Sequence, residues 1–203
     1  CYWKKCAFCD YINLHKDKIY RPRPVSDIIA DIQYYHSLKF KNFRMLAEAI
    51  PPKHAGEIAA APLHNNFHIF WHSFLRVDER FTPKILQSMA SSGFSCTVGM
   101  ESANTSILQT LNKGYDKKII RRFFYNFRIA SLKNNHLNII VGTPGATYDQ
   151  ELETLAFCRE YTDIFTRFKS GIFTLTPTSD MGKNPHKYGL RIKERGTDNQ
   201  PVH

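Results

Sequence analysis

The chain has 203 residues, of which 42% are hydrophobic and 23% charged, proportions typical of an ordinary soluble protein. This length is enough for one domain with a sizeable core, and no apolar run approaches the roughly 20 residues that a membrane span needs. The net charge of +10 favours anionic partners such as phosphates, and nucleic acid ranks lower because no RNA-binding signature of the RRM or KH type is visible.

Three cysteines stand within the first nine residues, at Cys1, Cys6 and Cys9. Their C-x4-C-x2-C spacing favours a metal centre over a disulfide framework, and a reducing cytoplasm is the expected compartment. An iron-sulfur cluster normally takes four thiolates, so three would leave one iron open to another ligand. With His15, the same cysteines could instead form a structural zinc site of the Cys3His type.

Apolar periodicity and capping residues predict helices and strands in alternation. In chain order, they are a helix over 26–38 capped by Ser26, a strand over 42–46, a weak helix over 53–63 interrupted by Gly56 and Pro62, a strand over 67–75, a helix from Pro83 that Gly93 closes, a strand over 95–100, a helix over 104–112, a longer helix that Asp116 caps, a strand over 137–141, a helix over 148–161 and a strand over 168–175.

This alternation predicts parallel βα units in an α/β fold. Because the chain opens on a cysteine and lacks an initiator Met, we expect an upstream segment to be absent. The expected fold is therefore an open (βα)6 partial TIM barrel over 1–178 with its first strand missing, followed by an irregular basic extension over 179–203. In such barrels the working groups lie on the loops after the strands.

The unusual polar residues all fall after predicted strands. The cysteine loop would follow the missing first strand, Glu48 follows the second, Arg76 ends the third and Glu101 ends the fourth. The segment 138–145 lies on and after the fifth. This convergence at one end of the barrel predicts a common site.

The residues of these segments resemble the radical S-adenosylmethionine (radical SAM) enzymes, especially the branch that often carries a cobalamin-binding domain upstream. The similarity covers most of the chain, although Ala47 and Ala146 stand where relatives usually place acidic residues. The similar segments are the loop 1–11 (CYWKKCAFCDY), 48–52 (EAIPP), 76–83 (RVDERFTP), 99–102 (GMES), 111–114 (LNKG), 141–145 (VGTPG) and 179–189.

The resemblance implies that Cys1, Cys6 and Cys9 bind a 4Fe-4S cluster whose open iron takes the amino and carboxylate groups of SAM. One electron would then cleave SAM to methionine and a 5'-deoxyadenosyl radical. It also implies a set of cofactor-binding residues: Glu48 near the methionine amino group, Glu101 facing SAM, Lys113 pairing with its carboxylate, Asn138 near the ribose, Gly142, Pro144 and Gly145 beneath the adenine, and Arg76 at the end of the third strand.

The implied partners are SAM, an unidentified substrate and a reductant such as flavodoxin or ferredoxin. Cobalamin is a candidate second cofactor, held by a domain outside this chain. Two other functions stay open: a tRNA-modifying protein of the methylthiotransferase type, and a zinc-stabilised module that binds nucleic acid.

The remaining cysteines and histidines have plainer interpretations. We expect Cys96 and Cys158 to be small buried groups. His68 and His72 share one strand face with Phe70, which indicates packing or pocket-lining groups rather than metal ligands.

Overall fold

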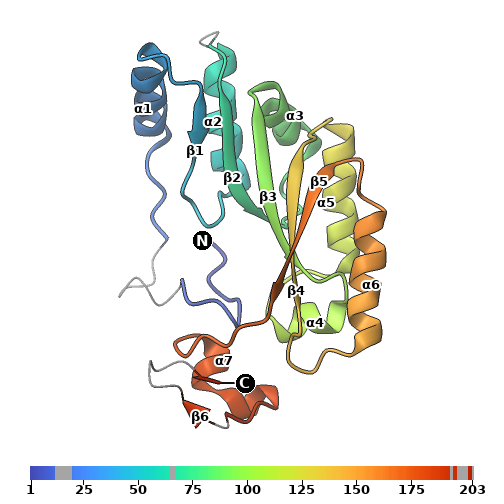
Figure 1. The fold of residues 1–203 in the computed structure, drawn as a ribbon. Coiled ribbons are helices and arrows are strands. Elements are labelled where there is room, and N and C mark those ends of the chain that lie inside the picture. The colour runs from blue at the N-terminus through green and yellow to red at the C-terminus, as the bar shows by residue number, and fades with distance from the viewer. Residues whose placement is uncertain (12–19, 65–66, 193, 196–200, 203) are drawn as a thin grey trace.

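The computed structural model describes residues 1–11, 20–64, 67–192, 194–195 and 201–202. Its centre is a five-stranded sheet in which each strand pairs in parallel with the next along the chain (Figure 1). The strands are β1 (Asn42–Arg44), β2 (Phe70–Arg76), β3 (Phe94–Glu101), β4 (Asn135–Val141) and β5 (Phe165–Ile172), with a separate antiparallel pair, β6 (Glu194–Arg195) and β7 (Pro201–Val202).

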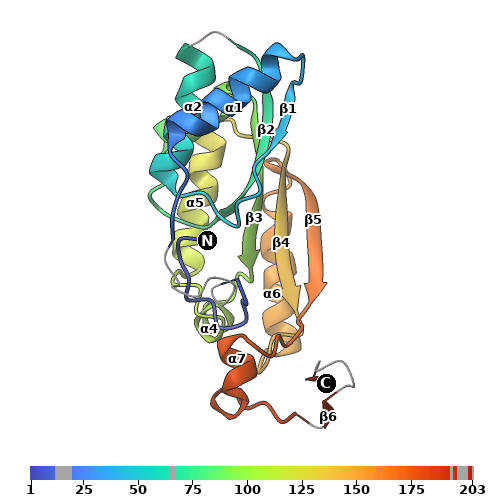
Figure 2. The same cartoon turned by 90° about the vertical axis from the view of Figure 1, so that its left-hand side faces the viewer.

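Helices connect consecutive strands, as parallel pairing requires. Figure 2 shows three of them, α1, α2 and α5, on one side of the strands, while no described helix covers the opposite side. The helices are α1 (Val25–Ser37), α2 (Pro52–His64), α3 (Pro83–Ser91), α4 (Thr105–Thr110), α5 (Lys117–Ile129), α6 (Tyr148–Arg159) and α7 (Asp180–Lys183), followed by a 3-10 turn (Pro185–Tyr188).

The predicted α/β fold of parallel βα units is confirmed. The predicted caps of α3 and α5 are also present: Thr82 accepts a hydrogen bond from the Ile85 amide, and Asp116 accepts one from the Ile119 amide. The stripe of phenylalanines on α5 lies in the core, where the Phe124 ring is 4.8 Å from that of Phe165. Burial of these aromatic rings fixes the helix against the sheet.

Two predictions about the helices are wrong, the cap of α1 and the interruption of α2. Ser26 does not cap α1, because its hydroxyl donates to Asp27 and the helix begins one residue earlier, after Pro24. The helix α2 is not interrupted: Pro62 lies in its last turn, and Gly56 allows close approach to Ile85 of α3. A proline near a helix end removes one backbone hydrogen bond, and packing against α3 compensates for it.

The last strand and the extension also differ from the sequence prediction. The strand β5 starts at Phe165 rather than at residue 168. The prediction began too late because Arg167 and Lys169 interrupt the apolar pattern of the strand. The segment after Ser179 is not irregular throughout, because it forms α7 and the 3-10 turn and buries Met181. The proposed division at 178 remains a prediction.

The carboxyl ends of the strands define one end of the molecule. The N-terminal loop, α4 and α7 gather there, at the lower end to which the strand arrows point (Figures 1 and 2). No helix among the described residues is long and apolar enough to cross a bilayer.

Candidate functional site

The cysteine loop is anchored by backbone hydrogen bonds to segments far away in sequence. The Ala7 amide donates to the Leu111 carbonyl after α4, and the Ala7 carbonyl accepts from the Met181 amide of α7, both at 2.9 Å. The Trp3 indole donates to the Asn112 carbonyl, also at 2.9 Å. The loop is therefore held on both sides over the strand ends.

Glycine at position 114 is required by the position of Trp3. Gly114 has φ of +71°, and a Cβ atom there would lie 2.1 Å from the indole ring. Only glycine combines this left-handed backbone with such close approach. The predicted 111–114 motif therefore has a packing role, because Gly114 leaves the space that the Trp3 ring occupies.

Arg76 joins the cysteine loop to the end of β2. Its guanidinium lies 4.3 Å from the Trp3 ring centre and 5.3 Å from that of Tyr115, and it donates to the Lys113 carbonyl. The residue is only 8% exposed, and its Nε atom has no hydrogen-bond partner in the part of the chain that the structure describes. Such desolvated cation–π stacking makes Arg76 a positioning residue for the loop.

A second cluster beside Arg76 surrounds Asp78. The Asp78 carboxylate accepts from the Tyr2 hydroxyl at 2.8 Å and from the Arg80 side chain at 2.6 Å, and Arg76 lies 3.8 Å away. Burial opposes ionisation, but the hydrogen bonds from Arg80 and Tyr2 hold the pKa of Asp78 below its usual value. Asp78 therefore ties Tyr2, and with it the start of the loop, to the turn after β2.

Glu101 and Lys113 form a buried ion pair next to the loop. The Lys113 Nζ lies 3.0 Å from a Glu101 carboxylate oxygen, and Lys113 is 4% exposed. A register shift at the end of β3 and a φ of +69° at Glu101 accompany this geometry. Burial alone would lower the pKa of Lys113, but the Glu101 carboxylate raises it, so the ammonium stays charged.

All three cysteines of the loop are free thiols. Burial raises the pKa of Cys6 and Cys9, and the Lys113 ammonium acts against this increase at both. Nowhere in the described part of the chain do three or more His, Cys, Asp or Glu side chains gather closely enough to hold a metal ion. His15, the fourth ligand of the zinc alternative, lies outside the described residues.

Glu48 reaches the cysteine loop from the segment after β1. Its carboxylate raises the pKa of Tyr11, and it also acts on Cys9 and on the terminal amino group. This carboxylate is thus close to the loop and remains exposed to solvent.

Asn138 and Thr143 carry buried oxygen atoms that have no hydrogen-bond partner among the described residues. These are the side-chain Oδ1 of Asn138 and Oγ1 of Thr143, on β4 and in the turn after it. Asn138 pairs in register with Gly99 of β3 and therefore lies in the same row of the sheet as Arg76. Buried polar atoms normally have a hydrogen-bond partner, so these two are candidates to contact a ligand.

The turn after β4 lies beside a cavity. Pro144 and Gly145 line a cavity of about 470 Å³ together with the end of α4 and Tyr188 of the 3-10 turn. Gly142 and Gly145 both have positive φ, and a Cβ at either would meet nothing within 4 Å. Their backbone is therefore open to a flat group.

The structure thus brings most predicted residues to one end of the sheet. Arg76, Glu101 and Lys113 contact one another or the cysteine loop, Glu48 approaches it from β1, and Asn138 lies in the row of Arg76. Trp3, Tyr115 and Asp78, which hold the loop in place, were not predicted as site residues. The aromatic pair Tyr2-Trp3 directly after Cys1 was the available signal.

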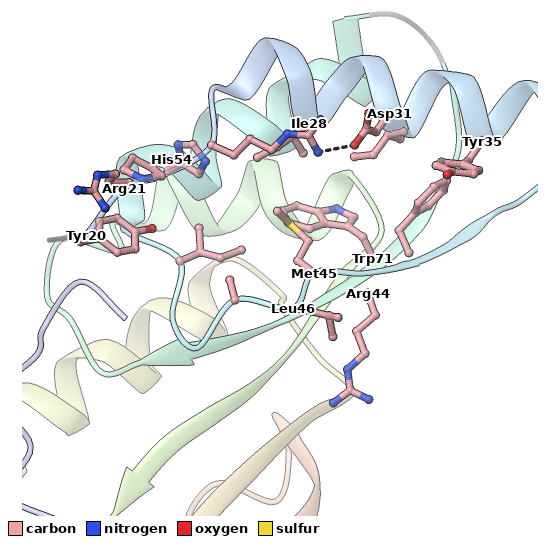
Figure 3. A pocket seen from close by; sticks show the side chains of 16 residues that line it. Tyr20, Arg21, Ile28, Asp31, Tyr35, Arg44, Met45, Leu46, His54 and Trp71 are labelled. Atoms are coloured by element: carbon pink, nitrogen blue, oxygen red, sulfur yellow. Dashed lines mark hydrogen bonds and ion pairs between the residues drawn. The ribbon is translucent and has the colours of Figure 1, made fainter. Parts of the chain in front are cut away.

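The cavity in Figure 3 lies elsewhere. It has a volume of about 530 Å³ between α1, β1 and the segment before α1, and it contains none of the predicted site residues. Trp71 and Met45 extend into it, whereas Arg44 points away, toward the uncovered face of the sheet. This cavity is therefore not part of the candidate site.

Comparison with solved structures shows which known fold the chain has. The chain superimposes over its full length on the cobalamin-dependent S-adenosylmethionine radical enzyme OxsB in its aqua-cobalamin form, with a TM-score of 0.74 and 14% identity, covering 36% of that chain. It also matches coproporphyrinogen III oxidase (HemN) from Escherichia coli, described as a radical SAM enzyme, with a TM-score of 0.62, 16% identity and 46% coverage of that chain. The chain has the radical SAM fold.

The sequence is also similar to that of one curated protein. The tRNA-2-methylthio-N(6)-dimethylallyladenosine synthase of Sulfurihydrogenibium sp. is 22% identical over 222 residues, which include 94% of this chain. No profile of a known protein family matches the sequence. The chain spans 46% of the length of that synthase.

Proposed function

We propose that the chain is the catalytic core of a radical SAM enzyme, in which Cys1, Cys6 and Cys9 hold a 4Fe-4S cluster. The chemistry of the donors fits this group, because three free thiols lie on one loop and none is used in a disulfide. When bound, the cluster would supply the electron that cleaves SAM to methionine and a 5'-deoxyadenosyl radical. The observation that carries the proposal is the cysteine loop fixed over the strand ends beside the Glu101–Lys113 pair.

The polar residues around the loop suit a zwitterionic ligand. Glu48 offers an exposed carboxylate for an ammonium group, and the Lys113 ammonium lies beside the loop, paired with Glu101. The unpartnered oxygen of Asn138 can accept a hydrogen bond from a ribose hydroxyl. The open backbone at Gly142 and Gly145 leaves room for a flat base.

Cobalamin use is the finer part of this proposal. It is supported by the similarity to OxsB, which binds cobalamin, and by the resemblance of the cysteine loop to the cobalamin-associated branch. The reductant, for which a flavodoxin or ferredoxin is the expected class, is likewise proposed.

Modification of tRNA is the second candidate function. The observation in its favour is the 22% identity with the tRNA-modifying synthase, together with the net charge of +10. The two candidates differ in substrate but share the cluster and SAM. A methyl or methylthio group transferred to a tRNA transcript would favour this second function.

The first test is electron paramagnetic resonance of the anaerobically reconstituted, dithionite-reduced protein, with and without SAM, alongside iron, sulfide and zinc analysis. We expect a reduced 4Fe-4S signal that changes when SAM is added. Stoichiometric zinc without that signal would support the nucleic-acid-binding module and contradict the enzyme.

Cysteine variants test the ligand assignment. Cys6→Ala should abolish the cluster, because two thiolates of the loop cannot replace three. Cys158→Ala is the matched control, since that thiol is buried on α6 among core residues, where burial raises its pKa to about 11. Loss of iron in both variants, or in neither, would show that the assignment is wrong.

A further inference from the structure

Five basic side chains lie on the uncovered face of the sheet. They come from four strands: Arg44 of β1, His72 of β2, His136 of β4, and Arg167 and Lys169 of β5. We call this set the basic row. None of the five belongs to the site described above.

Strand register places these side chains on one face. Arg44 pairs with His72, His136 pairs with Arg167, and Lys169 pairs with Asn138. Residues paired across adjacent parallel strands point to the same side of the sheet. Figure 3 shows the Arg44 guanidinium pointing away from the cavity beneath α1, in agreement with this placement.

The histidines link the two ends of the basic row. The His72 and His136 rings lie 5.9 Å apart, and His72 bonds to the hydroxyls of Ser95 and Thr97 at 3.0 and 3.1 Å. Burial, His136, Arg44 and Lys169 together lower the pKa of His72. Burial, Lys169 and Arg167 lower that of His136. His72 therefore lies in the field of cations from both edges of the sheet, and His136 in that of the two cations of β5.

The cations of the basic row have no acidic partner among the described residues. The Arg44 guanidinium lies 5.8 Å from the centre of the Phe74 ring. Among the described residues, Arg44, Arg167 and Lys169 form no ion pair. Clustered like charges on a concave surface repel one another and raise the local concentration of anions. Such an arrangement is stabilised when an anion binds.

We propose that the basic row binds a phosphate group of the substrate. Arginine matches the geometry of a phosphate with two parallel hydrogen bonds, and lysine adds a point charge. Lys169 lies beside Asn138, the residue proposed for the ribose of SAM, so a phosphate held by the row would keep the rest of the substrate near the strand ends. The inference rests on the proposed function for the identity of the occupant, whereas the binding itself needs neither cluster nor SAM.

The experiment is a titration of the full 203-residue chain with inorganic pyrophosphate, followed by the imidazole resonances of His72 and His136 in NMR spectra. We expect both resonances to shift and both pKa values to rise, because a bound anion favours the imidazolium. The resonances are assigned with His72→Gln and His136→Gln. Since cluster and SAM are absent, a failure here leaves the proposed function untouched.

Matched double variants measure the contribution of the basic row. Arg167→Gln/Lys169→Gln should weaken pyrophosphate binding at least about tenfold, since a hydrogen bond to a charged group has that effect or more. Lys118→Gln/Arg122→Gln removes the same charge from exposed positions on α5 and should change the affinity less than about twofold. Arg44→Gln, at the other edge of the sheet, should also weaken binding.

Three outcomes would overturn the proposal. The first is that pyrophosphate shifts neither histidine. The second is equal weakening in the α5 control, which would indicate a nonspecific effect of net charge. The third is that a short single-stranded RNA shifts the histidines but pyrophosphate does not, which would assign the row to nucleic acid instead of a compact phosphate.

Discussion

The charged groups at the carboxyl ends of the strands differ from those on the uncovered face of the sheet. At the strand ends, Lys113 pairs with Glu101, and Arg80 and Arg76 lie beside Asp78. On the uncovered face, the arginines and lysine of the basic row have no acidic partner among the described residues. The first group holds the cysteine loop in place, and the second has charge available for a ligand.

This difference separates positioning residues from binding residues. A buried ion pair contributes little net stability, but it fixes geometry, and removing one member is costly. An unpaired cation on a concave face costs little to remove and changes the affinity for anions. Substitutions at the strand ends should therefore mainly lower stability, whereas substitutions in the basic row should mainly weaken anion binding.

The largest effect on stability is expected for Lys113→Met. It leaves the Glu101 carboxylate buried without its partner, so the free energy of unfolding should fall by about 3–5 kcal/mol. Denaturant unfolding measures the change. In the double variant Lys113→Met/Glu101→Gln most of the loss should be recovered, and an additive loss would show that the pair does not act as a unit.

A smaller loss is expected for Gly114→Ala. The added Cβ would meet the Trp3 ring and the backbone would be strained, for a cost of about 2–4 kcal/mol and a lower iron content after reconstitution. Gly189→Ala is the control, because Gly189 has φ of +68° but nothing within 4 Å of the added atom. It should cost about 1–2 kcal/mol and leave the iron content unchanged.

The basic row should make stability depend on pH. The pKa of His72 and of His136 is below the ordinary value of about 6.5, so the unfolded chain binds more protons near that pH. The free energy of unfolding should therefore fall as pH drops below about 6.5. Denaturant titrations at several pH values check this, and the decrease should be smaller in His72→Gln/His136→Gln and in the presence of pyrophosphate.

The smallest effect is expected for an exposed ion pair far from both regions. Arg128 of α5 lies 2.7 Å from Asp163, with both side chains well exposed. Arg128→Gln should change the free energy of unfolding by less than about 1 kcal/mol and leave iron content and pyrophosphate affinity unchanged. A larger change would weaken the contrast between buried and exposed pairs.

Much of the fold could be predicted from local sequence. The aromatic stripe of α5 and the caps at Thr82 and Asp116 depend on neighbouring residues, and the structure agrees with them. Predictions failed where long-range contacts determine the extent of an element. The helix α2, which packs against α3, continues through Pro62. The strand β5 begins at Phe165, where its pairing with β4 starts, before the apolar run.

The candidate site was predictable in its residues but not in its contacts. The positions of Glu101, Lys113 and Arg76 after strands indicated a shared end of the sheet. Sequence spacing could not predict that Lys113 pairs with Glu101 or that Arg76 stacks on Trp3, because both contacts depend on the geometry of the folded backbone. The basic row was missed because its members come from four strands.

The two hydrogen bonds at Ala7 have a consequence for synthesis of the chain. Ala7 leaves the ribosome first, whereas its partners Leu111 and Met181 follow much later. At elongation rates of about 5–20 residues per second, the interval before Met181 is made is on the order of ten to thirty seconds. Throughout that interval the cysteine loop lacks its hydrogen bond to Met181, so α7 completes the anchoring of the loop only after nearly the whole chain has been made.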